Sequence, residues 1–203
     1  ANAGQNSNRT SVSDLGSVTQ SACFDQADRL TSYTAGATTV TPSYDYRGNV
    51  TSQNGDTYVY DVAGRHLSTT NGTTTVTYVR DATGAIVGRT DTSTGATVRY
   101  SGAAVLDSTG TTVVERTVSL AGGVSVTKRA AGDVWSYPNV HGDVAAVCDG
   151  AGVKQGATLS YDPYGNATAL PDNSDGAWDF GWLGQHTKGT EHASGLSSVI
   201  EMG

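Results

Sequence analysis

A short phrase recurs along this chain: an aromatic residue, an aspartate, two or three small or polar residues, a glycine, then a polar and an apolar residue. The fullest copy is Tyr60-Asp61-Val62-Ala63-Gly64-Arg65-His66-Leu67, and another is Tyr44-Asp45-Tyr46-Arg47-Gly48-Asn49-Val50. Phe24-Asp25-Gln26-Ala27-Asp28-Arg29-Leu30 is an earlier, degraded copy. Each unit of such an array is a supersecondary element that cannot bury its own apolar face, so the copies must pack on one another. The repeat therefore constrains the architecture first, and it argues against an enzyme because the pattern builds a surface.

Each copy predicts one turn and the strands on either side of it. Residues 57–60 alternate and are rich in aromatic and β-branched side chains, which suits a strand. The aspartate side chain of the phrase folds back onto backbone N–H groups just ahead, and the glycine supplies a positive φ without steric cost. Asn71-Gly72 is the strongest short hairpin signal in the sequence. We therefore predict an all-β chain of antiparallel β-hairpin repeats that form a curved, spiralling sheet.

The pattern weakens toward the C-terminus but persists. The residues that define it are Phe24, Asp25, Tyr44, Asp45, Gly48, Tyr60, Asp61, Gly64, Arg65, Asp81, Gly84, Asp107, Gly110, Asp149, Gly152, Tyr161, Asp162, Pro163, Tyr164 and Gly165. Residues 178–185 are aromatic and glycine-rich and predict a strand, whose rings we expect to cover one end of the sheet because terminal repeats are atypical. We therefore divide the chain into hairpin repeats over residues 1–134 and a distinct C-terminal part over residues 135–203.

Composition agrees with this architecture and argues against several functions. Ten tyrosines and 26 glycines suit half-buried strands joined by frequent turns, and no window shows the apolar spacing of an amphipathic helix. The net charge of −7 argues against nucleic acid and anionic membranes as partners. No apolar run approaches the roughly 20 residues that span a bilayer. Cys23 and Cys148 permit one disulfide, although two separate thiols are the favoured interpretation.

The ordered series of copies resembles the RHS (or YD) repeat family. Tyr161-Asp162-Pro163-Tyr164-Gly165 is similar to the "YDPYG" element of the RHS-repeat-associated core. As in that core, it follows segments like residues 139–144 and 149–152, and it precedes an aromatic-Gly-Gln element at residues 180–185 and a Gly-Leu pair at Gly195-Leu196. The resemblance covers most of the chain and identifies residues 135–203 as part of that core.

The resemblance implies a secreted or cell-surface bacterial protein whose hairpins form a hollow shell around a variable C-terminal toxin. Its expected partners are the rest of the parent chain and that toxin cargo. The family's "ARxYxPxxGRF" strand and aspartate-dependent self-cleavage site would follow Gly195-Leu196, and the sequence contains neither in full. The resemblance therefore supports no catalytic residue. On the clusters described next, we also expect no cofactor and no metal.

Three polar clusters were considered as sites. Asp172, Asp175 and Asp179 fit no Ca²⁺-loop spacing and predict a solvated loop, and His186, Glu191 and His192 lack the spacing of a zinc-binding helix. His141-Gly142-Asp143 reads as a turn or as part of a catalytic pair, and no recognisable nucleophile accompanies it. The glycine pairs at residues 122–123 and 150–152 precede no helix signal, which argues against phosphate loops.

Two functions of different classes follow. The leading prediction is a structural shell fragment that encloses or displays a toxin or effector, with open sheet edges that favour self-association. The alternative is a carbohydrate- or receptor-binding extracellular β module, in which the tyrosines serve as a sugar platform instead of packing across strands.

Overall fold

The computed structural model describes residues 8–162, 165–174, 176, 178–186, 188–197 and 199–200. The described chain is all-β, with antiparallel pairing between strands, and its only helical elements are the single 3₁₀ turns η1 (Ala121–Gly123) and η2 (Gly184–His186). No helix in the described part is long and apolar enough to cross a bilayer. The chain forms two compact units, residues 1–71 and 72–203. The boundary expected after residue 134 separates motifs, and it stays a prediction.

The described residues of the first unit, 8–71, form eight short strands. They are β1 (Ser11–Asp14), β2 (Ser17–Phe24), β3 (Leu30–Ala35), β4 (Thr38–Val40), β5 (Ser43–Tyr44), β6 (Val50–Gln53), β7 (Asp56–Tyr60) and β8 (His66–Asn71). β1 to β4 pair in chain order, and β5 to β8 do the same. Each strand therefore pairs with the strand that precedes or follows it.

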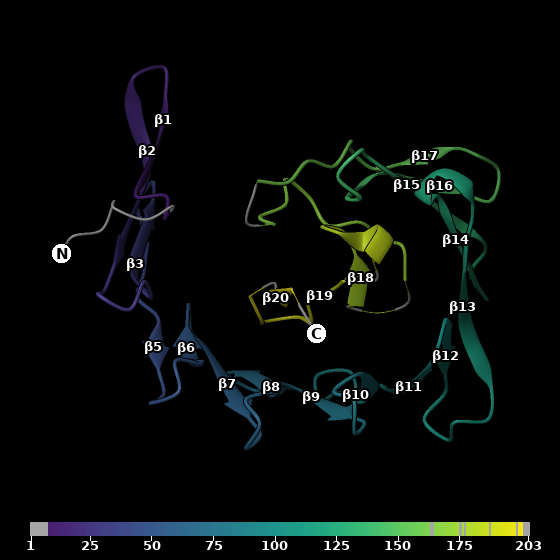
Figure 1. Cartoon of the computed structure of the whole chain (residues 1–203). Helices are drawn as coiled ribbons and strands as arrows, with labels where there is room; N and C mark the ends of the chain where they lie inside the picture. The colour runs from purple at the N-terminus through teal and green to yellow at the C-terminus, as the bar shows by residue number, and fades with distance from the viewer. Residues whose placement is uncertain are drawn as a thin grey trace. The chain divides into compact units, whose positions relative to one another are not determined.

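The second unit begins with a meander of nine strands. They are β9 (Thr74–Arg80), β10 (Ile86–Asp91), β11 (Thr97–Ser101), β12 (Ala104–Leu106), β13 (Val113–Ser119), β14 (Ser125–Arg129), β15 (Val134–Pro138), β16 (Val144–Asp149) and β17 (Lys154–Gln155). Each pairs with the next in antiparallel register. A separate three-stranded sheet follows, formed by β18 (Trp178–Phe180), β19 (Gly189–Glu191) and β20 (Val199–Ile200). Figure 1 shows β9–β17 curving around β18 and β19.

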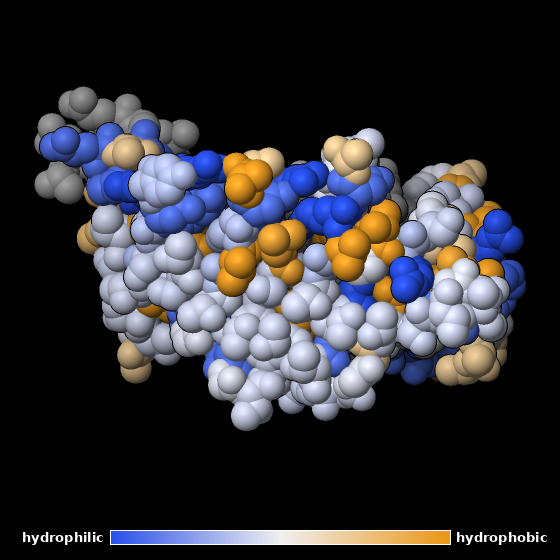
Figure 2. Space-filling view, turned by 90° about the horizontal axis from the view of Figure 1, so that it is seen from below, coloured by the Kyte–Doolittle hydropathy of each residue, from blue (hydrophilic) through white to orange (hydrophobic). Residues whose placement is uncertain are grey.

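Alternation along the strands gives the curved sheet an inner and an outer face. In β9, Thr74, Val76 and Tyr78 are buried, whereas Val79 is 61% exposed. Figure 2 shows the exposed hydrophobic residues as small patches among hydrophilic ones. The inner face therefore carries the side chains that the second unit buries.

The apolar core of the second unit is small and lies on this inner face. One cluster joins Val76 and Tyr78 of β9 to Trp178 and Ala193. Our expectation that the rings of residues 178–185 cover one end of the sheet is wrong for Trp178. Its indole lies against Tyr78 and Tyr100, at ring-centroid distances of 5.8 and 6.4 Å, so it packs on the face of the sheet. The curvature creates a concave face that needs an apolar cover, and Trp178 is large enough to provide it.

Candidate functional site: repeated turns and an inner segment

The aspartate of the repeated phrase closes the turn in which it lies. Asp61 Oδ1 accepts hydrogen bonds from the backbone N–H groups of Ala63 (2.8 Å) and Arg65 (2.9 Å). Its Oδ2 lies 2.6 Å from Nε of Arg65, and the N–H of Gly64 donates to the Asp61 carbonyl at 3.0 Å. Gly64 has a φ of 80°, which favours glycine. The carboxylate thus accepts two backbone N–H groups of the turn and the side chain of Arg65.

The same arrangement recurs at the other copies. The carboxylates of Asp25, Asp45, Asp81, Asp107, Asp149 and Asp162 each accept the backbone N–H of the residue four positions ahead. These bonds stabilise the ionised form. The N–H of Arg65 accordingly lowers the pKa of Asp61, and the Thr109 hydroxyl lowers the pKa of Asp107 to about 2. Pro163 and Tyr164 of the last copy lie outside the described residues.

One copy of this turn carries asparagine in place of aspartate. Asn139 Oδ1 accepts the N–H groups of His141 (2.8 Å) and Asp143 (3.1 Å), and the N–H of Gly142 donates to the Asn139 carbonyl at 3.1 Å. The repeated phrase is defined by its aspartate and so does not predict this copy, although an amide oxygen accepts the same bonds. Of the two readings of His141-Gly142-Asp143, the geometry is that of a turn.

Asp143 also joins this turn to the C-terminal part of the chain. Its Oδ1 lies 3.0 Å from Nδ1 of His141 and accepts the N–H of Leu183 at 2.9 Å. Burial disfavours the charged form, but the bonds from Leu183, His141 and Asn139 outweigh burial and lower the pKa of Asp143. The carboxylate therefore serves as an anchor for residue 183.

Several repeat tyrosines pack within their own unit. Tyr58 and Tyr60 place their rings against His66, at centroid distances of 5.8 and 5.6 Å. The Tyr44 hydroxyl donates to the Leu30 carbonyl at 2.7 Å, and the guanidinium of Arg29 lies 5.3 Å from the Tyr44 ring centre. Successive turns of the first unit thus contact one another through these side chains.

A buried ion pair of the second unit links β10 to β19. Arg89 donates from Nε and Nη2 to the two carboxylate oxygens of Glu191, at 2.6 and 2.7 Å. The same carboxylate accepts the Tyr78 hydroxyl at 2.9 Å and the N–H of Ala193 at 3.0 Å. Glu191 is 0% exposed and Arg89 is 6% exposed. Asp91 Oδ2 lies 3.7 Å from Arg89 Nη2 and adds a second, weaker attraction.

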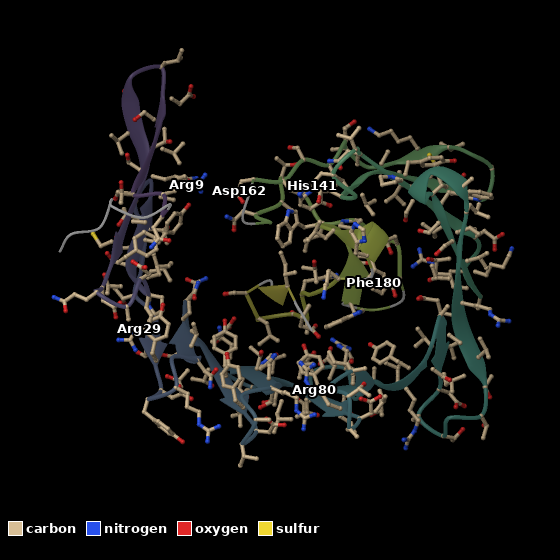
Figure 3. All side chains as sticks on the ribbon, in the orientation of Figure 1. Arg9, Arg29, Arg80, His141, Asp162 and Phe180 are labelled. Carbon is tan, nitrogen blue, oxygen red and sulfur yellow. The ribbon has the colours of Figure 1, made fainter. Side chains whose placement is uncertain are left out.

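Glu191 belongs to a stretch that we call the inner segment, the described residues between 171 and 197. Other polar contacts tie this segment to the inner face. Ser174 Oγ lies 2.9 and 3.1 Å from the carboxylate oxygens of Glu115, and its carbonyl accepts Nη1 of Arg129 at 2.7 Å. Asn173 Nδ2 donates to Ser136 Oγ at 3.1 Å. Figure 3 shows this segment, with Phe180 labelled, facing side chains of the surrounding strands.

The three aspartates expected in a solvated loop have different environments. Asp172 is exposed, whereas Asp179 is 2% exposed, so the expectation is wrong for Asp179. Its Oδ1 accepts the N–H groups of Asn173 and Ser174, both at 2.9 Å, and its Oδ2 lies 2.6 Å from Nε2 of His192. Asp175 lies outside the described residues. These bonds from the buried Asp179 carboxylate order the start of the inner segment.

The residues weighed as zinc ligands point to different partners. Glu191 contacts Arg89, and His192 contacts Asp179, whose hydrogen bond raises the pKa of His192. The described residues contain no group of three or more His, Cys, Asp or Glu side chains placed to hold a metal ion. Cys23 and Cys148 are both free thiols.

No family model matches the chain, and no curated protein matches it significantly. Among solved structures, a chain of a mutant Tc holotoxin pore from Photorhabdus luminescens is similar, with a TM-score of 0.47 and 16% sequence identity. The match covers 75% of this chain and 10% of that one, so this chain spans about a tenth of the matched protein's length. At this identity and score the similarity does not assign the chain to a family.

Proposed function

We propose that this chain is a segment of an RHS-type shell, a wall of β-hairpins that encloses or displays a C-terminal toxin or effector. The observation that supports it is the turn described above, which recurs in both units with the same carboxylate-to-backbone bonds. A fold that repeats one closed turn can be extended without a new core for each strand pair. A repeat that can be extended in this way is suited to building the wall of a shell. The function is structural, and the setting is a secreted or cell-surface bacterial protein.

The polar inner face is consistent with this role. Its buried side chains include Arg89, Glu115 and Thr127, each on a different strand of the second unit. A single globular enzyme of this size would bury mainly apolar side chains. In a shell that encloses a polypeptide, the inner face of the sheet binds that polypeptide, and buried polar side chains provide specific contacts with it.

The test uses the natural gene product that contains this chain. Limited proteolysis followed by mass spectrometry should show that sequence downstream of residue 203 is cleaved much more slowly than the same sequence expressed alone. A chain carrying Asp61→Ala and Asp81→Ala, which open two turns, should lose part of that protection. Downstream sequence cleaved at the rate of the free form would contradict enclosure, as would a gene product with no downstream sequence.

A binding module remains the second proposal, and Tyr46 favours it. Tyr46 is 88% exposed, and the guanidinium of Arg47 lies over one side of its ring, 5.4 Å from the ring centre. A glycan array compares the wild type with Tyr46→Ala, and Tyr60→Ala serves as a control for a packed ring. Loss of binding in Tyr46→Ala alone would support this function, and absence of any bound glycan would remove it.

A further inference from the structure

The inner segment is attached to the curved sheet almost entirely through side chains. β18, β19 and β20 pair only with one another among the described strands. Between the segment and the strands β9–β16, the described residues make one backbone–backbone hydrogen bond, from the N–H of Val144 to the Gly181 carbonyl at 2.9 Å. The segment is therefore a small module docked on the sheet, and not a continuation of it.

The two docked surfaces are complementary and different from each other. The sheet supplies the cation Arg89 and an apolar seat of Val76 and Tyr78, and the segment supplies the anion Glu191 and the indole of Trp178. A bidentate guanidinium–carboxylate pair fixes both distance and orientation. The inner face of β9–β16 thus recognises this particular segment, whichever copy of the chain carries it.

The link between sheet and segment is short and exposed. Thr168, Ala169 and Leu170 are exposed and belong to no strand. Thr168 is hydrogen-bonded to Ser160, and Ala169 and Leu170 then lead into the inner segment. Three extended residues reach about 10 Å. This link joins the sheet to the inner segment that binds it. Exchange of an element between identical protomers requires such a hinge.

We propose that the inner segment exchanges between two copies of the chain, so that the inner face of each copy binds the segment of the other. Both arrangements contain the same docking contacts, including Arg89 with Glu191 and Tyr78 with Glu191. The closed monomer and the exchanged dimer differ in the conformation of the hinge, and only the dimer requires two chains to associate. The exchanged dimer therefore increases with protein concentration. This inference does not depend on the shell proposal.

The decisive experiment mixes two charge-reversed variants of the full chain, Arg89→Glu and Glu191→Arg. Each closed monomer then places like charges together, which disfavours docking by about 100-fold or more in equilibrium constant. In a mixed exchanged dimer, both docking sites regain opposite charges. One variant is labelled with ¹⁵N, the two are refolded together, and native mass spectrometry identifies the dimer of mixed mass. We expect the mixed dimer to exceed either homodimer by at least about tenfold.

A second experiment avoids charge reversal, so it does not require the chain to fold with reversed charges. Thr74 Oγ1 lies 2.8 Å from the Ser194 carbonyl, so Thr74→Cys in one copy and Ser194→Cys in the other become neighbours only after exchange. Both carry Cys23→Ser and Cys148→Ser, and a short bifunctional thiol cross-linker is added after refolding at low and at high concentration. A hetero-cross-linked dimer that grows with concentration supports the proposal. Failure of both mixtures to yield a dimer of mixed mass overturns it.

Discussion

The contact between Arg89 and Glu191 gives the sharpest test of what holds the inner segment in place. Glu191→Met removes a fully buried carboxylate that accepts hydrogen bonds from Arg89, Tyr78 and Ala193. The guanidinium of Arg89, 6% exposed, is then left without its bidentate partner. Removal of one member of a buried ion pair costs about 3–5 kcal/mol. Because domains of this size are stable by about 5–15 kcal/mol, we expect the loss to be a large fraction of the total.

The double variant Arg89→Met/Glu191→Met distinguishes the attraction between the two charges from the free-energy cost of burying them. Replacement of both charges by apolar side chains is often close to neutral. The double variant should therefore be more stable than Glu191→Met, with a coupling free energy of about 2 kcal/mol or more. Lys128→Met, which removes the exposed ion pair with Asp133, is the matched control and should cost no more than about 1 kcal/mol.

The assay is urea-induced unfolding followed by tryptophan fluorescence. All three tryptophans of the chain, Trp135, Trp178 and Trp182, lie in the second unit, so the signal reports the unit that contains the ion pair. Free energies of unfolding come from the midpoint and the slope. A cost below about 1 kcal/mol for Glu191→Met, or additive effects in the double variant, would refute the role assigned to the pair.

Three further predictions concern single positions. Asp61→Asn should unfold at a higher denaturant concentration than Asp61→Ala, because an amide oxygen still accepts the turn's backbone bonds; circular dichroism in urea measures the difference. Asp107 should titrate with a pKa of about 2 by NMR, and since this value lies below the ordinary 3.8, the associated stability is present above pH 3.8 and is lost as pH falls toward 2. Gly189→Ala should destabilise the second unit by about 2 kcal/mol or more in the tryptophan assay, because a Cβ there meets the Trp178 indole, whereas Gly150→Ala meets ordinary contacts and should cost much less.

The local part of the fold could be predicted from the sequence. The Asp-x-x-Gly phrase encodes bonds within five residues, such as those of Asp61, so its geometry needs no distant partner. The asparagine copy at Asn139 does not follow from the phrase, because the phrase specifies a residue type and the turn requires only an acceptor at that position. Alternating strands then made an all-β antiparallel chain the natural conclusion.

The inner segment could not be predicted, because its contacts join residues far apart in sequence. Arg89 and Glu191 are separated by 102 positions, and nothing local marks either as a partner of the other. The spacing of Asp179 from Asp172 and Asp175 placed it in a polar loop, although its immediate neighbours, Trp178 and Phe180, are aromatic. In the structure Asn173 and Ser174 are themselves buried beside it. A polar composition describes solvated loops and buried hydrogen-bond networks equally well.

The two units should unfold in different ways, because the inner segment belongs to the second unit alone. In the first unit each described strand pairs only with neighbours in sequence, so strands can detach one after another from the N-terminal end. In the second unit the inner segment bonds to strands from β9 to β16, from Thr74 of β9 at one end to Val144 of β16 at the other. If one of these strands detaches, the inner segment loses contacts and binds the remaining strands more weakly. The second unit should accordingly yield all at once under a pulling force, whereas the first should peel away hairpin by hairpin.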